Sequence, residues 1–103
     1  MKLLYKAYGC EKIDGKNLLL PGYPVDGVAK PVEAGSKIQV ELADGTLLQT
    51  QAVGTQIFCP TESVMDHLRV KKTASSPWYY AVQVPDDFSP TAVELGVTVC
   101  LVE

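Results

Sequence analysis

The stretch VEAGSKIQVELADGTLLQTQAVGTQIF, residues 32–58, holds the most regular pattern in this chain. Within it, Lys37–Leu42 alternates polar and apolar side chains, the two-residue period of a strand with one buried and one wet face. Asp44-Gly45 follows, a dipeptide that supplies the positive φ angles of a tight turn. We therefore expect Leu47–Phe58 to fold back antiparallel on the first run.

The second run does not alternate cleanly along its whole length. The pattern slips near Gly54 and recovers only at Ile57. A glycine inside a long strand often marks a bulge or the bend at a barrel corner. We expect the strand to bend at this point.

Turn signals recur along the rest of the chain. Asp14-Gly15 and Asp26-Gly27 repeat the turn dipeptide, and the run from Pro21 to Pro24 is expected to break a strand. Short apolar runs between these signals predict further strands. They are 3–8, 10–13, 18–20, 28–32, 78–84 and 97–102.

One helix is expected near residues 61–70. Thr61 is suited to its N-cap, Glu62 to its positive end, and Arg69, Lys71 and Lys72 to its negative end. Repeated turns between short strands favour an all-β fold over alternating strands and helices. The prediction is a single domain, residues 1–103, that forms a small antiparallel β-barrel with Greek-key-like order and this one helix.

Composition excludes several classes of protein. The chain has 103 residues, a net charge of −3 and a single arginine, which disfavours a basic face for duplex nucleic acid. No run approaches the 18 apolar residues of a membrane helix. The three cysteines lack paired spacing and are expected to be reduced, buried side chains, so we expect a cytoplasmic protein without membrane attachment.

The order of these strands resembles the second, β-barrel domain of translational GTPases. The similarity lies in the short strand expected at 28–32, the glycine turn at Ala34–Ser36, the strand Lys37–Leu42, the segment Gln51–Phe58 and the final Glu94–Val99. It implies a barrel fold and covers about half of the chain. The chain has no G-x-x-x-x-G-K-[ST] loop, so no nucleotide-binding domain is expected. Residues 59–77 depart from the family pattern, and the family's tRNA and ribosome contacts have no matching residues here.

Signals for catalysis and for metal binding are sparse. Cys59 and the single histidine, His67, could form a nucleophile and base, but no third group or oxyanion hole is indicated. Asp86-Asp87 suits a turn better than a cation site. We expect no enzyme activity, no cofactor and no metal, and a small cysteine-dependent enzyme ranks third among the hypotheses.

The run Trp78-Tyr79-Tyr80 is the most conspicuous aromatic cluster. Alternation puts Trp78 and Tyr80 on one face of a strand and Tyr79 on the other, so at least one ring should be exposed. If Tyr79 is the outward ring, basic side chains flank it. The candidate interaction surface comprises Arg69, Lys71, Lys72, Trp78, Tyr79 and Tyr80.

This surface leads to two hypotheses of binding. The first is a non-catalytic module for a protein partner, because tyrosine and tryptophan are enriched at binding hot spots. The alternative is single-stranded nucleic acid or tRNA stacked on the aromatic rings beside the basic residues. The interpretation that competes with both is an exposed tyrosine on an edge strand, with its hydroxyl in water and without any function.

Overall fold

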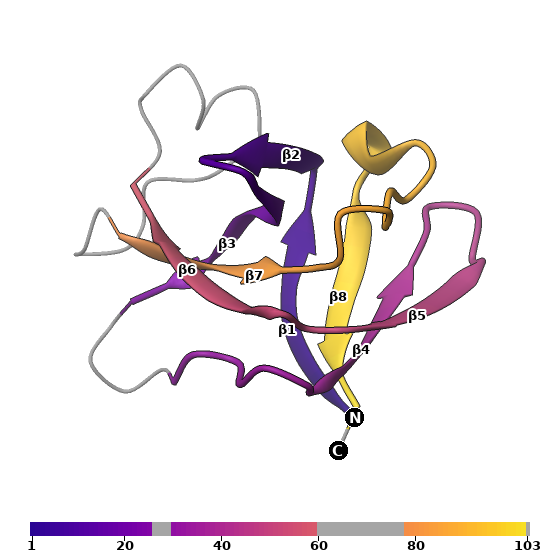
Figure 1. The fold of residues 1–103 in the computed structure, drawn as a ribbon. Helices are drawn as coiled ribbons and strands as arrows, with labels where there is room; N and C mark the ends of the chain where they lie inside the picture. Colours follow the sequence, from indigo (N-terminus) through magenta and orange to yellow (C-terminus); the bar gives the residue numbers. More distant parts are fainter. Residues whose placement is uncertain (26–29, 60–77, 103) are drawn as a thin grey trace.

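The computed structural model describes residues 1–25, 30–59 and 78–102, and the described chain is all-β (Figure 1). It forms two four-stranded antiparallel sheets. The first has the order β1 (Lys2–Ala7), β8 (Val97–Leu101), β4 (Lys37–Glu41) and β5 (Leu47–Gln51). The second has the order β2 (Gly9–Ile13), β3 (Lys16–Pro24), β7 (Tyr79–Gln83) and β6 (Gly54–Phe58). Within the described ranges, the sole helical element is the 3-10 turn η1 (Val93–Leu95).

The predicted hairpin at the centre of the chain is confirmed. β4 and β5 pair antiparallel, with Val40 opposite Leu48, and Gly45 in the turn has a φ of 90°. Ile38 and Val40 are fully buried, whereas Glu41 is exposed. The alternation of this strand therefore separates core from solvent as the sequence predicts.

The predicted bend in the second run is a change of sheet. The amide nitrogen of Ala52 donates to the carbonyl oxygen of Ser36 in the first sheet (2.8 Å), and that of Val53 donates to Gln83 in the second (2.8 Å). Successive amides of an extended chain point to opposite sides, so one strand can serve both sheets in turn. β6 then begins at Gly54.

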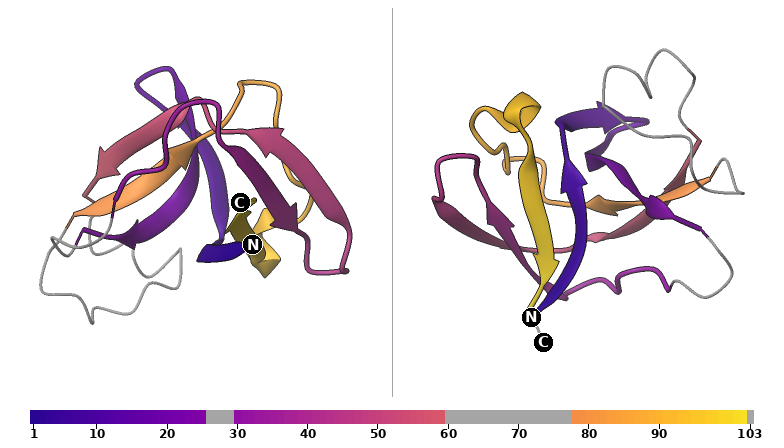
Figure 2. Two further views of the ribbon diagram at one scale, coloured as in Figure 1. Left: turned by 90° about the horizontal axis from the view of Figure 1, so that it is seen from below. Right: turned by 180° about the vertical axis from the view of Figure 1, so that it is seen from behind.

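A second continuous strand joins the other edges of the two sheets. β1 passes into β2 through Tyr8, whose amide nitrogen donates to the carbonyl oxygen of Leu20 in β3 (2.9 Å). Figure 2 shows both crossings, β1 into β2 and β5 into β6. The sheets enclose one main core, whose fully buried members include Leu19, Ile38, Val40, Val82, Val97 and Val99.

Two expectations about the first third of the chain need correction. Pro21-Gly22 does not end a strand, because β3 continues to Pro24 and only its register against β7 shifts between Leu19 and Tyr23. Lys30–Val32 is not in a strand, although Val32 is buried in the core. Proline at position 31 cannot donate a ladder hydrogen bond, which explains the lack of pairing there.

Other predictions have mixed outcomes. The turn at Asp14-Gly15 is confirmed, with positive φ angles at both residues, and so are the strands β1, β2, β7 and β8. The expected helix near 61–70, and residues 28 and 29 of the expected strand 28–32, lie outside the described residues.

Candidate functional site

The three aromatic residues at the start of β7 have different surroundings. Tyr79 is only 4% exposed, Tyr80 is half-buried, and Trp78 is 48% exposed. Tyr79 is therefore not the outward ring, and the exposed ring that the alternation predicts is that of Trp78. β7 lies between β3 and β6 and is covered on both faces: Val82 belongs to the main core, and Ala81 packs with a second cluster. Side chains within this central strand are covered by its neighbours. Trp78 immediately precedes the first residue of β7, and its side chain is the exposed one of the three.

Tyr80 belongs to a row of tyrosine rings that runs from the core toward the surface. The ring centroids of Tyr5 and Tyr23 are 5.9 Å apart, and those of Tyr23 and Tyr80 are 5.5 Å apart, both pairs tilted. Such tilted contacts stabilise aromatic pairs beyond simple burial. Burial, with a further contribution from Tyr80, raises the pKa of Tyr23. The row holds the end of β3 against β7.

An apolar hollow of about 430 Å³ is lined by Val25, Ile57 and Trp78 and is here called the apolar site. The amide nitrogen of Val25 donates to the carbonyl oxygen of Trp78 (3.0 Å), which extends the pairing of β3 with β7. Ile57 in β6 is opposite Tyr80 and is 63% exposed. Three strands thus bring three apolar side chains to one end of the second sheet.

Sequence reasoning found Trp78 but missed Val25 and Ile57. Their proximity follows from the pairing of β3 and β6 with β7, which joins segments more than 20 residues apart. The predicted basic residues Arg69, Lys71 and Lys72 lie outside the described residues, as does His67.

The cysteines are three free thiols in different environments. Cys10 and Cys100 are half-buried, but Cys59 is exposed directly after β6, so the expectation that all three are buried is wrong. The Cys10 thiol donates to the Asn17 amide oxygen (3.4 Å), and burial raises its pKa. A raised pKa keeps the thiol protonated and weakly nucleophilic at neutral pH.

The described carboxylates and cysteines do not gather into a metal-binding cluster: no group of three or more His, Cys, Asp or Glu occurs within residues 1–25, 30–59 and 78–102. Asp86 and Asp87 are exposed in the turn after β7, where the amide nitrogen of Phe88 donates to the carbonyl oxygen of Pro85 (3.0 Å). This position agrees with their predicted role in a turn.

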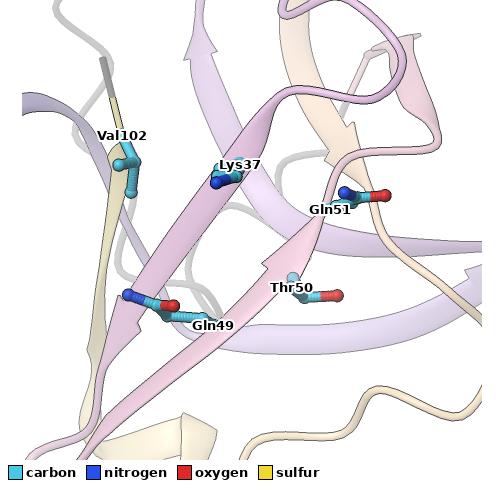
Figure 3. A pocket seen from close by; sticks show the side chains of 5 residues that line it. All are labelled: Lys37, Gln49, Thr50, Gln51 and Val102. Atoms are coloured by element: carbon cyan, nitrogen blue, oxygen red, sulfur yellow. The ribbon is translucent and has the colours of Figure 1, made fainter.

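A second hollow, of about 260 Å³, lies on the first sheet (Figure 3). It is called the polar hollow, and its lining residues are Lys37, Gln49, Thr50, Gln51 and Val102. Lys37 is opposite Gln51 in the β4–β5 pair, and Val102 follows β8. Its lining is mostly uncharged and polar, in contrast to the apolar site.

Comparisons of the chain with protein-family models, with curated proteins and with solved structures found no match. None of the helices in the described part of the chain has the length and hydropathy needed to cross a membrane.

Proposed function

We propose that this domain is a non-catalytic binding module and that its apolar site receives another protein. The observation that carries the proposal is the exposure of two large apolar side chains, Trp78 at 48% and Ile57 at 63%, beside one hollow. Tryptophan in a partly enclosed apolar setting is the side chain most enriched at the energetic centre of protein interfaces. A partner that covers the apolar site would remove the side chains of Trp78 and Ile57 from water.

The absence of catalysis is part of this proposal. The Cys10 thiol donates to the Asn17 amide oxygen and to the Phe88 carbonyl oxygen, neither of which serves as a general base. A nucleophilic cysteine needs a base within hydrogen-bond reach or a lowered pKa, and the pKa of Cys10 is raised.

We also propose that the two sheets form one barrel, similar in fold to the second domain of translational GTPases. Its support is that both pairs of sheet edges are joined by continuous strands, β1 with β2 and β5 with β6. Strands that switch from one sheet to the other form the corners of orthogonally packed, barrel-like sheets. This similarity of fold carries no function to the chain.

Two steps test the proposed site. The first captures a partner, and the second titrates that partner while following the fluorescence of Trp78, the single tryptophan of the chain. Proteins captured from a cell extract on the tagged domain are compared with those captured on Ile57→Ser. The matched control is Leu95→Ser, which changes another apolar residue, 60% exposed, on η1. A candidate partner binds the parent and the control but is lost from Ile57→Ser.

The purified candidate is then titrated into the domain. We expect Trp78 emission to shift to shorter wavelength and to become less accessible to acrylamide. Ile57→Ser should weaken binding about tenfold or more, the loss typical of a central apolar contact, while Leu95→Ser should bind as the parent does. A partner that binds Ile57→Ser as tightly as the parent, with no change in Trp78 emission, would contradict the proposal.

Single-stranded nucleic acid is the competing outcome, because an exposed indole ring can also stack on a base. Titration with oligonucleotides of mixed sequence distinguishes the two. If binding occurs and its affinity falls steeply with salt, the site serves nucleic acid and the protein-binding proposal fails.

A further inference from the structure

One edge of β5 presents backbone groups that pair with no strand in the described part of the chain. The amide nitrogen of Leu42 donates to the carbonyl oxygen of Thr46 (2.8 Å), and Ala52 exchanges hydrogen bonds with Gly35 and Ser36 (2.7 and 2.8 Å). Alternate residues of an antiparallel strand bond to the same neighbour. The even-numbered residues 46–52 therefore face β4.

The odd-numbered residues Leu47, Gln49 and Gln51 consequently direct their N–H and C=O groups away from β4. Val53, the next odd-numbered residue, already donates to Gln83 in the second sheet. β5 itself stands at a margin of the molecule in all three views (Figures 1 and 2). This unpaired side is called the free edge of β5.

The free edge lacks the features by which natural proteins protect exposed strands. Such edges usually carry charges, a proline or a bulge that prevents pairing with another strand. Residues 46–59 contain no charged residue and no proline. The pairing of β4 with β5 shows no register shift from Lys37 to Glu41. The edge is therefore regular, uncharged and open to a further strand.

We propose that the free edge of β5 pairs antiparallel with the free edge of β5 in a second copy of this chain. The two-fold axis passes beside Gln49, so Gln49 faces Gln49 of the second copy and Leu47 faces Gln51. All opposed residues are odd-numbered, so each presents N–H and C=O groups toward the other. The two first sheets become one continuous sheet of eight strands.

The symmetric register suits a second copy because all residues that it opposes across the new interface are uncharged, so the two copies bring no like charges opposite each other. Lys37 is opposite Gln51, and Glu41 is opposite Leu47. In the symmetric register, four cross-strand neighbours form a row across the interface. The row runs from Lys37 through Gln51 to Leu47 and then Glu41 of the second copy. Lys37 and Glu41 of the second copy, at the two ends of each row, are opposite in sign but about 14 Å apart at three strand spacings, so screening leaves little attraction between them. Leu47, 56% exposed, comes to lie beside Gln51 at the polar hollow.

This proposal is independent of the proposed function, because the apolar site belongs to the second sheet. The experiment is sedimentation equilibrium of the whole chain from about 10 µM to about 1 mM, the range that suits a weak interface. We expect a monomer–dimer equilibrium for the parent. A protein that remains monomeric throughout would overturn the proposal.

Charge substitution at position 49 then locates the interface. Gln49→Lys and Gln49→Glu each put like charges opposite each other, and each should lower the dimer association constant at least about tenfold, as close like-charge pairs do. An equimolar mixture should restore dimers as the mixed pair. Gln39→Lys, one strand away on β4, is the control and should leave dimerisation within about twofold, because screening weakens a charge at that distance.

Two other results would contradict the proposed pairing. Dimers that persist in both single variants, or a mixture that stays monomeric, would place the interface elsewhere. Amide hydrogen exchange of the parent provides a measurement that needs no variant. Exchange at Leu47, Gln49 and Gln51 should slow as the protein concentration rises. Exchange that is equal at low and high concentration would rule out pairing through this edge.

Discussion

The hydroxyl of Tyr5 in β1 donates a hydrogen bond of 2.7 Å to the carbonyl oxygen of Leu19 in β3. The same hydroxyl accepts a hydrogen bond of 3.2 Å from the amide nitrogen of Val82 in β7. Leu19 and Val82 face each other immediately before the register of β3 against β7 shifts. A side chain of the first sheet thus satisfies main-chain groups of the second at the point where their ladder is interrupted.

Tyr5→Phe removes both hydrogen bonds without changing the shape of the buried ring. We expect the free energy of unfolding to fall by about 1–3 kcal/mol, because a buried amide and a buried carbonyl lose a partner. Urea denaturation measures the change. Tyr80→Phe is the matched control: its hydroxyl forms no hydrogen bond within the described residues, so it should cost much less. Equal losses would show that the Tyr5 bridge contributes nothing specific.

Alkaline pH provides a second test of the Tyr5 hydroxyl. Burial raises the pKa of Tyr5 well above its usual value of 10.0, and the hydrogen bond from Val82 opposes this only in part. Below pH 10.0 both the folded and the unfolded chain keep the proton, so this group adds no pH dependence. Above it the unfolded chain releases the proton first, and stability falls by up to about 1.4 kcal/mol per pH unit.

We therefore expect stability to decline slightly above pH 9.0, where the raised pKa of Cys10 begins to act, and more steeply above about pH 10, where Tyr5 adds to it. Tyr23, whose pKa is also raised by burial, contributes to the same decline. Tyr5→Phe should make the decline clearly shallower, whereas Tyr80→Phe should change it less, because it removes only the contribution of Tyr80 to the raised pKa of Tyr23. Thermal melting between about pH 8 and pH 11 measures both slopes. Parallel slopes for the parent and Tyr5→Phe would contradict the burial of an unionised Tyr5.

Gly22→Ala should prevent stable folding. Gly22 has a φ of 95°, and an added Cβ would lie 2.2 Å from the carbonyl oxygen of Tyr80, a main-chain atom that cannot rotate away. Gly45→Ala is the control, with a φ of 90° but no heavy atom within 4 Å of the added carbon. We expect about 1–2 kcal/mol for backbone strain at Gly45 and a considerably greater loss at Gly22. Circular dichroism and thermal melting compare the two.

Asn17 joins the β2–β3 hairpin to the turn after β7. Its amide nitrogen donates to the carbonyl oxygens of Pro85 (2.9 Å) and Phe88 (2.8 Å). Asn17→Ala removes one donor from each oxygen, so the Pro85 oxygen keeps only the Phe88 amide nitrogen and the Phe88 oxygen only the weak Cys10 thiol. The free energy of unfolding should fall by about 1–3 kcal/mol.

Asn17→Asp should be worse at neutral pH, because it turns a carboxylate toward two carbonyl oxygens. Cys10→Ala, which removes a weak thiol donor to Asn17 and to the Phe88 carbonyl oxygen, is the mild comparison. Urea denaturation ranks the three variants. If Cys10→Ala costs as much as Asn17→Ala, these two hydrogen bonds are not what secures the turn.

Local patterns were sufficient wherever neighbours in sequence decide the structure. The alternation from Lys37 to Leu42 and the dipeptide Asp44-Gly45 predicted the central hairpin, and the slip near Gly54 predicted the bend. Both depend on backbone geometry and on side-chain period, which a short segment carries by itself. The same reasoning failed at Pro21-Gly22, because β7 pairs across that irregular segment and keeps it in the sheet.

The amino-acid sequence alone determined the strand content, the main turns and the buried face of β4, because these depend on propensity and periodicity over a few residues. Only the tertiary structure decided that Tyr79 is buried, that Trp78 lines one hollow with Val25 and Ile57, and that the N–H and C=O groups of the even-numbered residues of β5 face β4. These features depend on which distant strands become neighbours and in which register. Pairing of that kind is selected by the packing of the whole chain, so no single segment contains it.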